Sequence, residues 1–383
     1  MSTAIDVRAL SSRVRIELDD SLSDAEQAAI SAHWADLAWD GGGEPDRVLR
    51  AGILADGAPL DATLTISANS PHALAQRITS QVTLEAIGGL RGEALMLHAA
   101  AVALDDGRVI GFIGPSGRGK TTAAQELGRA FGYVTDETLA VRADGSIIPY
   151  PKPLSIVTES GVKATESASG LGLTGLPQAE LQLAALVLLD RRPEVSQPSV
   201  ESVPMIEALP ELVAQSSFVS ALDRPLGTLI DTVRRTGGVR RVVYSEAASI
   251  AGLVDDLLAT VEEPAPVVLD VAGLSQRDCD CAGKPVDEAP GGSAHDVPGA
   301  YWRGAFVDAK LVDDALVVLA SGRLTVLAGV GPALWLAADG LSEDELKAAA
   351  NADLPAPPPG VDVDGILSEA LSGLVDAGIL ARS

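Results

Sequence analysis

Short apolar runs, each bounded by turn-forming residues, recur along the first two thirds of the chain and predict β-strands. The run at residues 109–113 (VIGFI) has no polar interruption, which is typical of a strand buried on both faces. The predicted strands are residues 14–18, 62–67, 96–104, 109–113, 133–134, 139–143, 184–190 and 240–246.

Longer segments with apolar residues three and four positions apart alternate with these strands and predict amphipathic helices. The segment at residues 70–90 opens with Ser70 and Pro71, which suit an N-cap and the first helical position. Strands alternating with helices predict an α/β fold. Further helices are expected at residues 21–39, 121–130, 206–216, 226–236 and 249–261.

The composition changes near residue 262, where a stretch rich in Pro, Gly, Asp and Ser begins. Residues 262–298 are therefore expected to be a linker. We divide the remainder into an N-terminal α/β region (1–91), a central domain (92–261) and a C-terminal unit (299–383).

The C-terminal unit has its own local signals. A hairpin is expected to turn at Ser321-Gly322, and Ser342 with Glu345 forms a capping box that starts a helix. A last amphipathic helix is expected to end near Gly378.

Charge and composition exclude several classes of function. The formal net charge is −25, so most of the surface would repel nucleic acid. No apolar run is long enough to cross a bilayer, and no secretory signal is visible, so we expect no membrane contact and a cytoplasmic location. Two cysteines, Cys279 and Cys281, agree with a reducing compartment. A homo-oligomer is left open.

The octet GPSGRGKT at residues 114–121 is the strongest chemical signal. Its glycines let backbone N–H groups approach phosphate oxygens, Lys120 supplies a charge to the β and γ phosphates, and Thr121 is placed to bind Mg²⁺. A chance glycine loop is the alternative, but an apolar strand precedes the octet and a helix follows it. The expected nucleotide-binding residues are Gly114, Pro115, Ser116, Gly117, Arg118, Gly119, Lys120, Thr121 and Thr122.

Two positions offer a second carboxylate. Asp190 ends an apolar strand, as a Walker B aspartate does, although a simple turn before Arg191-Arg192-Pro193 explains it equally well. Asp136 and Glu137 end the strand that follows the loop helix, at the sheet edge where such folds bind ligands. Such a pair can divide the roles of base and metal ligand, and a solvated acidic turn is the alternative.

Residues 92–257 resemble the HPr kinase/phosphorylase family, through Leu97-His98, the octet and Thr135-Asp136-Glu137 in that order. The resemblance implies that Asp136 is the general base toward a serine hydroxyl, that His98 lies beside it, and that Glu137 supports Mg²⁺. From the residues alone, a packed strand histidine is the favoured interpretation of His98. The family usually has Asp where this chain has Glu137, and its later EIRGLG signature is absent, which leaves one metal-binding carboxylate unassigned.

Residues 149–156 (PYPKPLSI) look like the divergent branch of HPr-kinase-like proteins found with peptide-modification systems. Lys152 in this stretch could hold phosphate or simply belong to a Pro-rich turn. The main basic cluster likewise has two interpretations, a grip on phosphate or acidic peptide and ordinary surface charges. It comprises Arg224, Arg234, Arg235, Arg240 and Arg241.

Residues 300–383 resemble PqqD-like domains, small winged-helix peptide binders of ribosomal peptide biosynthesis. The matching features are the hairpin, Ala333-Leu334-Trp335, Asp339-Gly340 and the Gly378-Ile379-Leu380 ending. The resemblance implies that a precursor leader peptide adds as a strand to the hairpin edge. A packing or dimerisation module is the alternative, and the net charge disfavours a DNA-reading winged helix. Nearby residues of metal-ligand type are interpreted as linker: Asp278, Cys279, Asp280, Cys281 and His295.

Together these patterns predict an α/β protein with an HPr-kinase-like P-loop core, an α/β N-terminal region and a C-terminal winged-helix domain. The leading hypothesis is an ATP- and Mg²⁺-dependent serine kinase that acts on a precursor peptide, with Asp136, His98 and Lys120 as catalytic residues and Thr121 with Glu137 as metal ligands. The other hypotheses are a nucleotide-switched peptide-binding scaffold and a kinase of free serine or another small hydroxyl compound.

Overall fold

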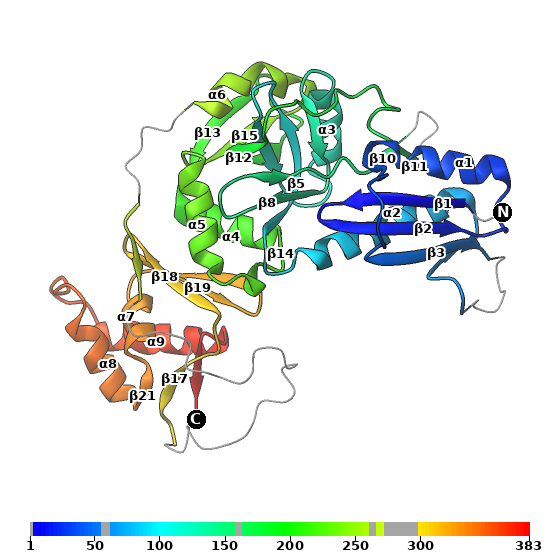
Figure 1. The fold of residues 1–383 in the computed structure, drawn as a ribbon. Helices are drawn as coiled ribbons and strands as arrows, with labels where there is room; N and C mark the ends of the chain where they lie inside the picture. The colour runs from blue at the N-terminus through cyan, green and yellow to red at the C-terminus, as the bar shows by residue number, and fades with distance from the viewer. Residues whose placement is uncertain (1–2, 55–61, 158–162, 260–265, 272–297) are drawn as a thin grey trace. The chain divides into compact units, whose positions relative to one another are not determined.

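The computed structural model describes residues 3–54, 62–157, 163–259, 266–271 and 298–383, and these form a mixed α/β protein with several sheets (Figure 1). The chain divides into two compact units. The first comprises Met1–Asp223 and Gly227–Glu263, and the second Arg224–Leu226 and Pro264–Ser383. The linker residues considered as a metal site, 278–281 and His295, lie outside the described residues.

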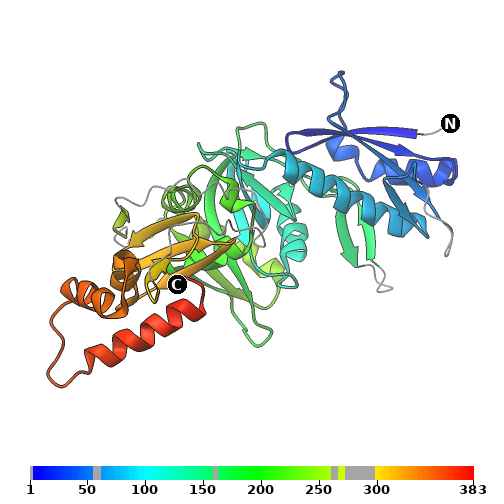
Figure 2. The same ribbon diagram turned by 90° about the horizontal axis from the view of Figure 1, so that it is seen from below.

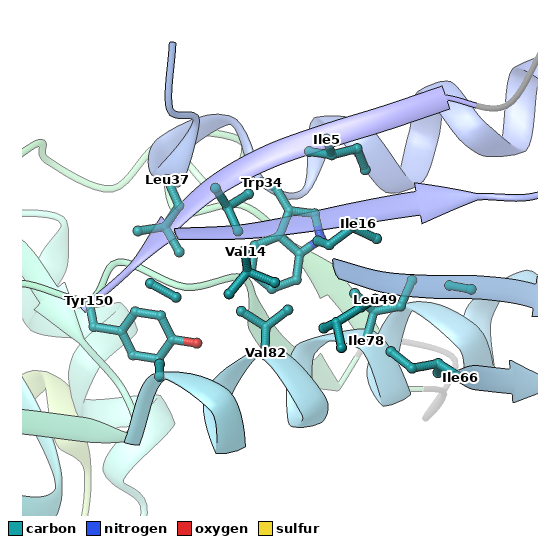
Figure 3. Packing of buried hydrophobic residues seen from close by; sticks show 14 of the residues in the cluster. Ile5, Val14, Ile16, Trp34, Leu37, Leu49, Ile66, Ile78, Val82 and Tyr150 are labelled. Atoms are coloured by element: carbon teal, nitrogen blue, oxygen red, sulfur yellow. The ribbon is translucent and has the colours of Figure 1, made fainter. Parts of the chain in front are cut away.

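The first unit opens with a four-stranded sheet of order β1-β2-β3-β4. Buried residues alternate along β2, so one face of this sheet supplies a hydrophobic core. Helix α2 runs along the sheet (Figure 2), and its residues Ile78 and Val82 meet Val14 and Trp34 in that core (Figure 3). The elements are β1 (Thr3–Ala9), β2 (Ser12–Leu18), α1 (Asp24–Ala32), η1 (Ala35–Leu37), β3 (Arg47–Ile53), β4 (Ile66–Ala68) and α2 (Pro71–Gly89).

Tyr150 extends the same core into the following part of the chain. Its side chain is fully buried within the N-terminal cluster (Figure 3). The hydroxyl shares a hydrogen bond of 3.0 Å with the Thr83 hydroxyl of α2. The described parts of the N-terminal region and of the central domain therefore share one hydrophobic core.

The largest sheet has nine strands, with the main order β13-β15-β12-β6-β5-β8-β9 and with β7 and β14 also paired to β5. Strand β12 is parallel to β6 and β15, whereas β5 is antiparallel to β6. One core packs α3, η3 and α6 against the central strands. The strands are β5 (Leu95–Ala103), β6 (Arg108–Ile113), β7 (Gly132–Thr135), β8 (Thr138–Val141), β9 (Ile147–Ile148), β12 (Gln182–Arg191), β13 (Ser199–Val203), β14 (Ser216–Ser217) and β15 (Val239–Tyr244).

Strands β10 (Leu154–Val157) and β11 (Lys163–Glu166) form a separate antiparallel pair. The helical elements of this part are α3 (Lys120–Gly128), α4 (Met205–Ala214), η2 (Val219–Ala221), α5 (Pro225–Arg235), η3 (Ala247–Leu253) and α6 (Val254–Leu258). Among the described residues, no helix combines the length and the apolar character needed to cross a membrane.

The second unit has a four-stranded sheet of order β16-β18-β19-β20 and a small sheet of order β21-β17-β22. Trp335 is fully buried where α7, α8 and α9 pack on these strands. The elements are β16 (Val268–Asp270), β17 (Tyr301–Arg303), β18 (Asp308–Val312), β19 (Ala315–Ala320), β20 (Arg323–Leu327), α7 (Gly331–Ala337), β21 (Asp339–Leu341), α8 (Glu343–Ala352), α9 (Val363–Asp376) and β22 (Leu380–Arg382).

Most local predictions from the sequence are confirmed. Ser70 caps α2 with Pro71 in its first turn, Ser321 and Gly322 have positive φ angles between β19 and β20, and Ser342 forms its capping box. Three differences stand out. The strand expected at residues 62–67 is reduced to β4, the helix at 249–261 begins as the 3-10 segment η3, and the expected linker contains β16, which pairs with β18.

Candidate functional site

Strand β5 organises the candidate site, because the pairing on its two sides is interrupted at adjacent residues, His98 on one side and Ala99 with Ala100 on the other. On one side β6 ends at Ile113, opposite Ala99, and β14 resumes the pairing at Ser216, opposite Leu97. On the other side β7 ends opposite Ala101 and β8 begins with Thr138 opposite His98. The glycine loop leaves the sheet at the first interruption and the Asp136-Glu137 pair at the second. Sheet register thus brings these segments together.

The sequence predicted that the acidic pair would end a strand, and the structure shows an interruption instead. The chain continues from β7 into β8 along β5, and Asp136 and Glu137 lie between the two paired stretches, although the Glu137 carbonyl oxygen still accepts a hydrogen bond of 3.0 Å from the Ala99 amide of β5. The Thr135 hydroxyl accepts hydrogen bonds of 3.2 Å from the amides of Glu137 and Thr138, which shapes this irregularity. Bulged positions of this kind re-aim side chains and recur beside functional sites.

The glycine loop has the backbone conformation that its sequence predicts. Gly117 and Gly119 have φ angles of +82° and +92°, where a side chain is unfavourable. Gly119 is the N-cap of α3, so the helix begins at Lys120 and directs its N-terminal amides toward the loop. Pro115, Ser116, Gly117 and Arg118 are exposed, Gly119 and Thr121 are half-buried, and Thr122 is exposed. The loop is therefore open to a ligand while its helix is anchored.

Lys120 lies under this loop. Its ammonium group donates hydrogen bonds to the carbonyl oxygens of Gly114 at 2.6 Å and Pro115 at 3.3 Å. Burial lowers the pKa of Lys120, although the charges of Asp136 and Glu137 act in the opposite direction. Asp136 and Glu137 are therefore close enough to Lys120 for their charges to act on its ammonium group.

Tyr244, at the end of β15, fixes the loop from a neighbouring strand. Its hydroxyl donates a hydrogen bond of 2.8 Å to the carbonyl oxygen of Arg118. A methyl group on Gly119 would lie 2.9 Å from this hydroxyl, so the close approach requires glycine. The sequence analysis did not single out Tyr244; the available signal was its position at the end of a strand in the same sheet.

The carboxylate of Asp136 is almost completely buried. Tyr133 donates a hydrogen bond of 3.2 Å to its Oδ1. Burial and the neighbouring charge of Asp136 raise the pKa of Tyr133, which keeps this phenol protonated. Tyr133 was a further omission of the sequence analysis, because its partner depends on the turn at Thr135.

Lys152 joins both acids. Its ammonium nitrogen lies 2.9 Å from Asp136 Oδ1 and 3.1 Å from Glu137 Oε2, and it donates to the Pro153 carbonyl oxygen at 3.2 Å. Burial alone would lower the pKa of Lys152, but the two carboxylates outweigh it and raise the pKa above its ordinary value. Beyond the two interpretations drawn from the sequence, Lys152 is an internal counter-ion of the acidic pair.

His98 lies in β5 next to both interruptions and is half-buried. Its backbone amide donates a hydrogen bond of 2.7 Å to the Gln215 carbonyl oxygen. Burial lowers the pKa of His98, and the charge of Lys120 lowers it further, whereas Glu137 and Asp136 oppose both effects. The imidazole is therefore neutral at pH 7, and it shares the environment of Lys120 and the acids.

Asp190 is engaged in other contacts. Its carboxylate pairs with Arg192 at 2.6 Å and lies 3.9 Å from Arg118 of the glycine loop. Asp190 therefore lies near the glycine loop, but its carboxylate is already paired with the guanidinium group of Arg192.

The basic cluster is largely structural. Arg241 pairs with Glu211 at 2.6 Å, and Arg235 donates to the Ala143 carbonyl oxygen at 2.9 Å. The expectation of surface charge is wrong for Arg240, which is only 3% exposed and donates to the carbonyl oxygens of Thr236 and Ala259. These three arginines are satisfied by the protein itself.

No family model matches the chain. A search of curated proteins finds no match either.

Proposed function

We propose that the first unit is an ATP-dependent serine kinase with an HPr-kinase-like P-loop core, and that its acceptor is a ribosomally made precursor peptide. The observation that carries the proposal is the double interruption beside β5, at adjacent residues of that strand, from which the glycine loop and the Asp136-Glu137 pair leave on opposite sides. A phosphate cradle and a carboxylate that can accept the hydroxyl proton are two recurring parts of sites that transfer a phosphoryl group to a hydroxyl group.

The triphosphate would be held by the loop amides, the N-terminus of α3 and Lys120. Mg²⁺ prefers oxygen ligands and keeps part of its coordination for phosphate and water. The Thr121 hydroxyl and the Glu137 carboxylate, whose side chain is 37% exposed, are suitable donors. Among the described residues, no group of three or more His, Cys, Asp or Glu side chains could hold a metal ion. The metal would thus be bound jointly by the chain and the nucleotide.

In the proposed reaction the acceptor serine oxygen attacks the γ-phosphorus, and the bond from that phosphorus to the β–γ bridging oxygen breaks. The serine proton moves to the carboxylate of Asp136, and ADP leaves with the electron pair of the broken bond. The described protein contacts of Asp136 are made through Oδ1, so Oδ2 is the oxygen that would accept the proton. Neutral His98 can orient the acceptor without repelling the metal-bound nucleotide.

The acceptor assignment rests on the second unit, for which we propose a PqqD-like winged-helix fold. Strand β20 lies at one edge of its sheet, whereas β16 covers the opposite edge. An extended leader peptide can add to the β20 edge by main-chain hydrogen bonds. The acceptor serine would then belong to a peptide held by its leader rather than to a free amino acid.

The test is incubation of the full chain with ATP, Mg²⁺ and a candidate precursor peptide from a neighbouring gene, followed by mass spectrometry. We expect the peptide to gain one phosphoryl group. Asp136→Asn should abolish transfer while nucleotide binding persists, and the exposed control Asp106→Asn should leave transfer unchanged. An unmodified peptide under conditions where nucleotide is bound contradicts the proposal. Full activity on free serine after removal of residues 299–383 would contradict the peptide acceptor.

A further inference from the structure

The charge balance around Asp136 and Glu137 raises a question that the proposed phosphoryl transfer does not answer. Two adjacent carboxylates, one of them with a side chain only 4% exposed, would repel each other and lose hydration without a compensating cation. In many phosphate-handling sites that cation is a divalent metal. In this chain a lysine from a different segment stands between the two acids.

The contacts of Lys152 are those of a cation built into the site. Its side chain is 5% exposed, and one nitrogen contacts an oxygen of each carboxylate at 2.9 and 3.1 Å. A third contact, at 3.2 Å, is to the carbonyl oxygen of Pro153. The three hydrogens of an ammonium group match these three acceptors.

The backbone fixes this position from two sides. The Lys152 amide donates to the Tyr150 carbonyl oxygen at 2.8 Å, and the Tyr150 amide donates to the Val134 carbonyl oxygen of β7 at 3.1 Å. Tyr150 itself is locked in the N-terminal core. Backbone hydrogen bonds and the buried Tyr150 therefore fix the position of Lys152, which differs in this respect from a mobile lysine on the surface.

We infer that Lys152 takes the place of a resident divalent cation between Asp136 and Glu137. The acidic pair consequently binds no metal ion by itself, and a divalent ion enters this site only together with a nucleotide. Only the entry of a divalent ion together with a nucleotide rests on the proposed function. The behaviour of the nucleotide-free chain follows from the contacts of Lys152 with the two carboxylates alone.

The test uses the nucleotide-free full chain and Mn²⁺ as the probe, followed by electron paramagnetic resonance at about physiological ionic strength to screen weak surface binding. The wild-type chain and its Glu137→Gln variant should bind equal amounts of Mn²⁺, because the Lys152 ammonium group already occupies the position between the two carboxylates. Lys152→Met should bind one Mn²⁺ more per chain, and addition of Glu137→Gln to Lys152→Met should remove that gain.

A matched variant separates charge from the mere loss of a side chain. Lys152→Met with Asp136→Asn restores the net charge of the cluster and should gain no Mn²⁺. Thermal unfolding gives a second measurement. Mg²⁺ should raise the melting temperature of Lys152→Met, and it should leave the melting temperatures of the wild type and of Lys152→Met with Asp136→Asn unchanged.

Three results would overturn the inference. The first is loss of bound Mn²⁺ when Glu137→Gln is introduced into the wild-type chain without nucleotide. The second is an equal Mn²⁺ stoichiometry for Lys152→Met and the wild type. The third is a Lys152→Met chain that stays unfolded at every Mn²⁺ and Mg²⁺ concentration, because a divalent ion would then fail to replace the ammonium group. None of these results requires kinase activity, so they are distinguishable from a failure of the proposed reaction.

Discussion

The ammonium nitrogen of Lys152 lies 2.9 Å from Asp136 Oδ1, and both side chains are almost closed to solvent. Removal of one partner leaves the other charge buried and uncompensated. Lys152→Met should therefore lower the free energy of unfolding by about 3–5 kcal/mol, measured by urea denaturation without added divalent ions. Arg108 and Asp106 form a solvent-exposed pair at 2.8 Å. The control Arg108→Met should therefore change the free energy of unfolding by less than about 1 kcal/mol. Equal losses in the two variants would contradict a buried ion pair.

Gly119→Ala should impair nucleotide binding. The substitution places a side chain at a φ of +92° and a methyl group 2.9 Å from the Tyr244 hydroxyl. Gly172 is a suitable control, because it also has a positive φ, +68°, but no atom lies within 4 Å of its would-be Cβ. Both variants should lose about 1–2 kcal/mol of stability from the backbone, and only Gly119→Ala should also lose affinity for ATP, measured by calorimetry. Unchanged ATP affinity in Gly119→Ala would argue against this loop as the phosphate cradle.

Tyr244→Phe tests the hydrogen bond that restrains the same loop. Loss of the hydroxyl removes the 2.8 Å contact to Arg118 and should weaken ATP binding by up to about tenfold. Tyr301→Phe removes a comparable hydroxyl, 3.2 Å from Glu343 in the second unit, and should leave ATP affinity unchanged. Similar affinities in both variants would show that the loop is held by other contacts.

The titration of His98 tests the charge arrangement of the site. Burial and Lys120 hold its pKa below the ordinary value of about 6.5, and Glu137 opposes them. Lys120→Met should therefore raise the pKa of His98, and Glu137→Gln should lower it further, as followed by NMR of the imidazole. Shifts of the same sign in both variants would contradict the arrangement.

The lowered pKa of His98 also predicts how the free energy of unfolding changes with pH. Because the folded chain holds His98 deprotonated at a pH where the unfolded chain protonates it, the free energy of unfolding should fall as pH drops below about 6.5. His98→Gln should reduce that slope in a series of urea denaturation curves. His33 also has a pKa lowered by burial, so part of the slope should persist. An identical slope in His98→Gln would contradict the assignment.

Strand β20 offers a test of the proposed peptide edge. In a hairpin with a turn at Ser321-Gly322, Ala320 and Arg323 form the first hydrogen-bonded pair, so the amide of Val326 points away from β19. Val326→Pro should abolish binding of the leader peptide without breaking the hairpin, measured by fluorescence anisotropy. Val326→Thr retains the amide and should bind normally. Undiminished binding by Val326→Pro would locate the peptide elsewhere.

The sequence signals were sufficient wherever a feature is local. The glycine octet, the Ser70 cap and the Ser321-Gly322 turn depend on a few consecutive residues with well-defined backbone preferences. Strands β1 and β3 carry charged residues within their apolar pattern, and β16 lies in a Pro-rich stretch, so their runs were too weak to identify.

The contact partners of the site residues could not be predicted from the sequence. The contact of Arg118 with Tyr244 joins segments that the register of β6, β12 and β15 brings together. The contact of Asp136 with Lys152 depends on the backbone hydrogen bond from Tyr150 to Val134 of β7. The sequence therefore indicated which residue types the site contains, whereas their charge pairing depended on tertiary structure. The irregularity between β7 and β8 was hidden because Asp136 and Glu137 look like an ordinary strand end.

The hydrogen bond between Tyr150 and Thr83 has a practical consequence for any shortened version of this protein. A fragment that starts at residue 92 would retain the glycine loop, His98 and the acidic pair, but it would strip α2 from around Tyr150. The lysine two residues later would then lose its anchor. The described residues between 3 and 91 therefore support the position of Lys152, which lies outside that range, and the smallest fragment worth expressing includes them.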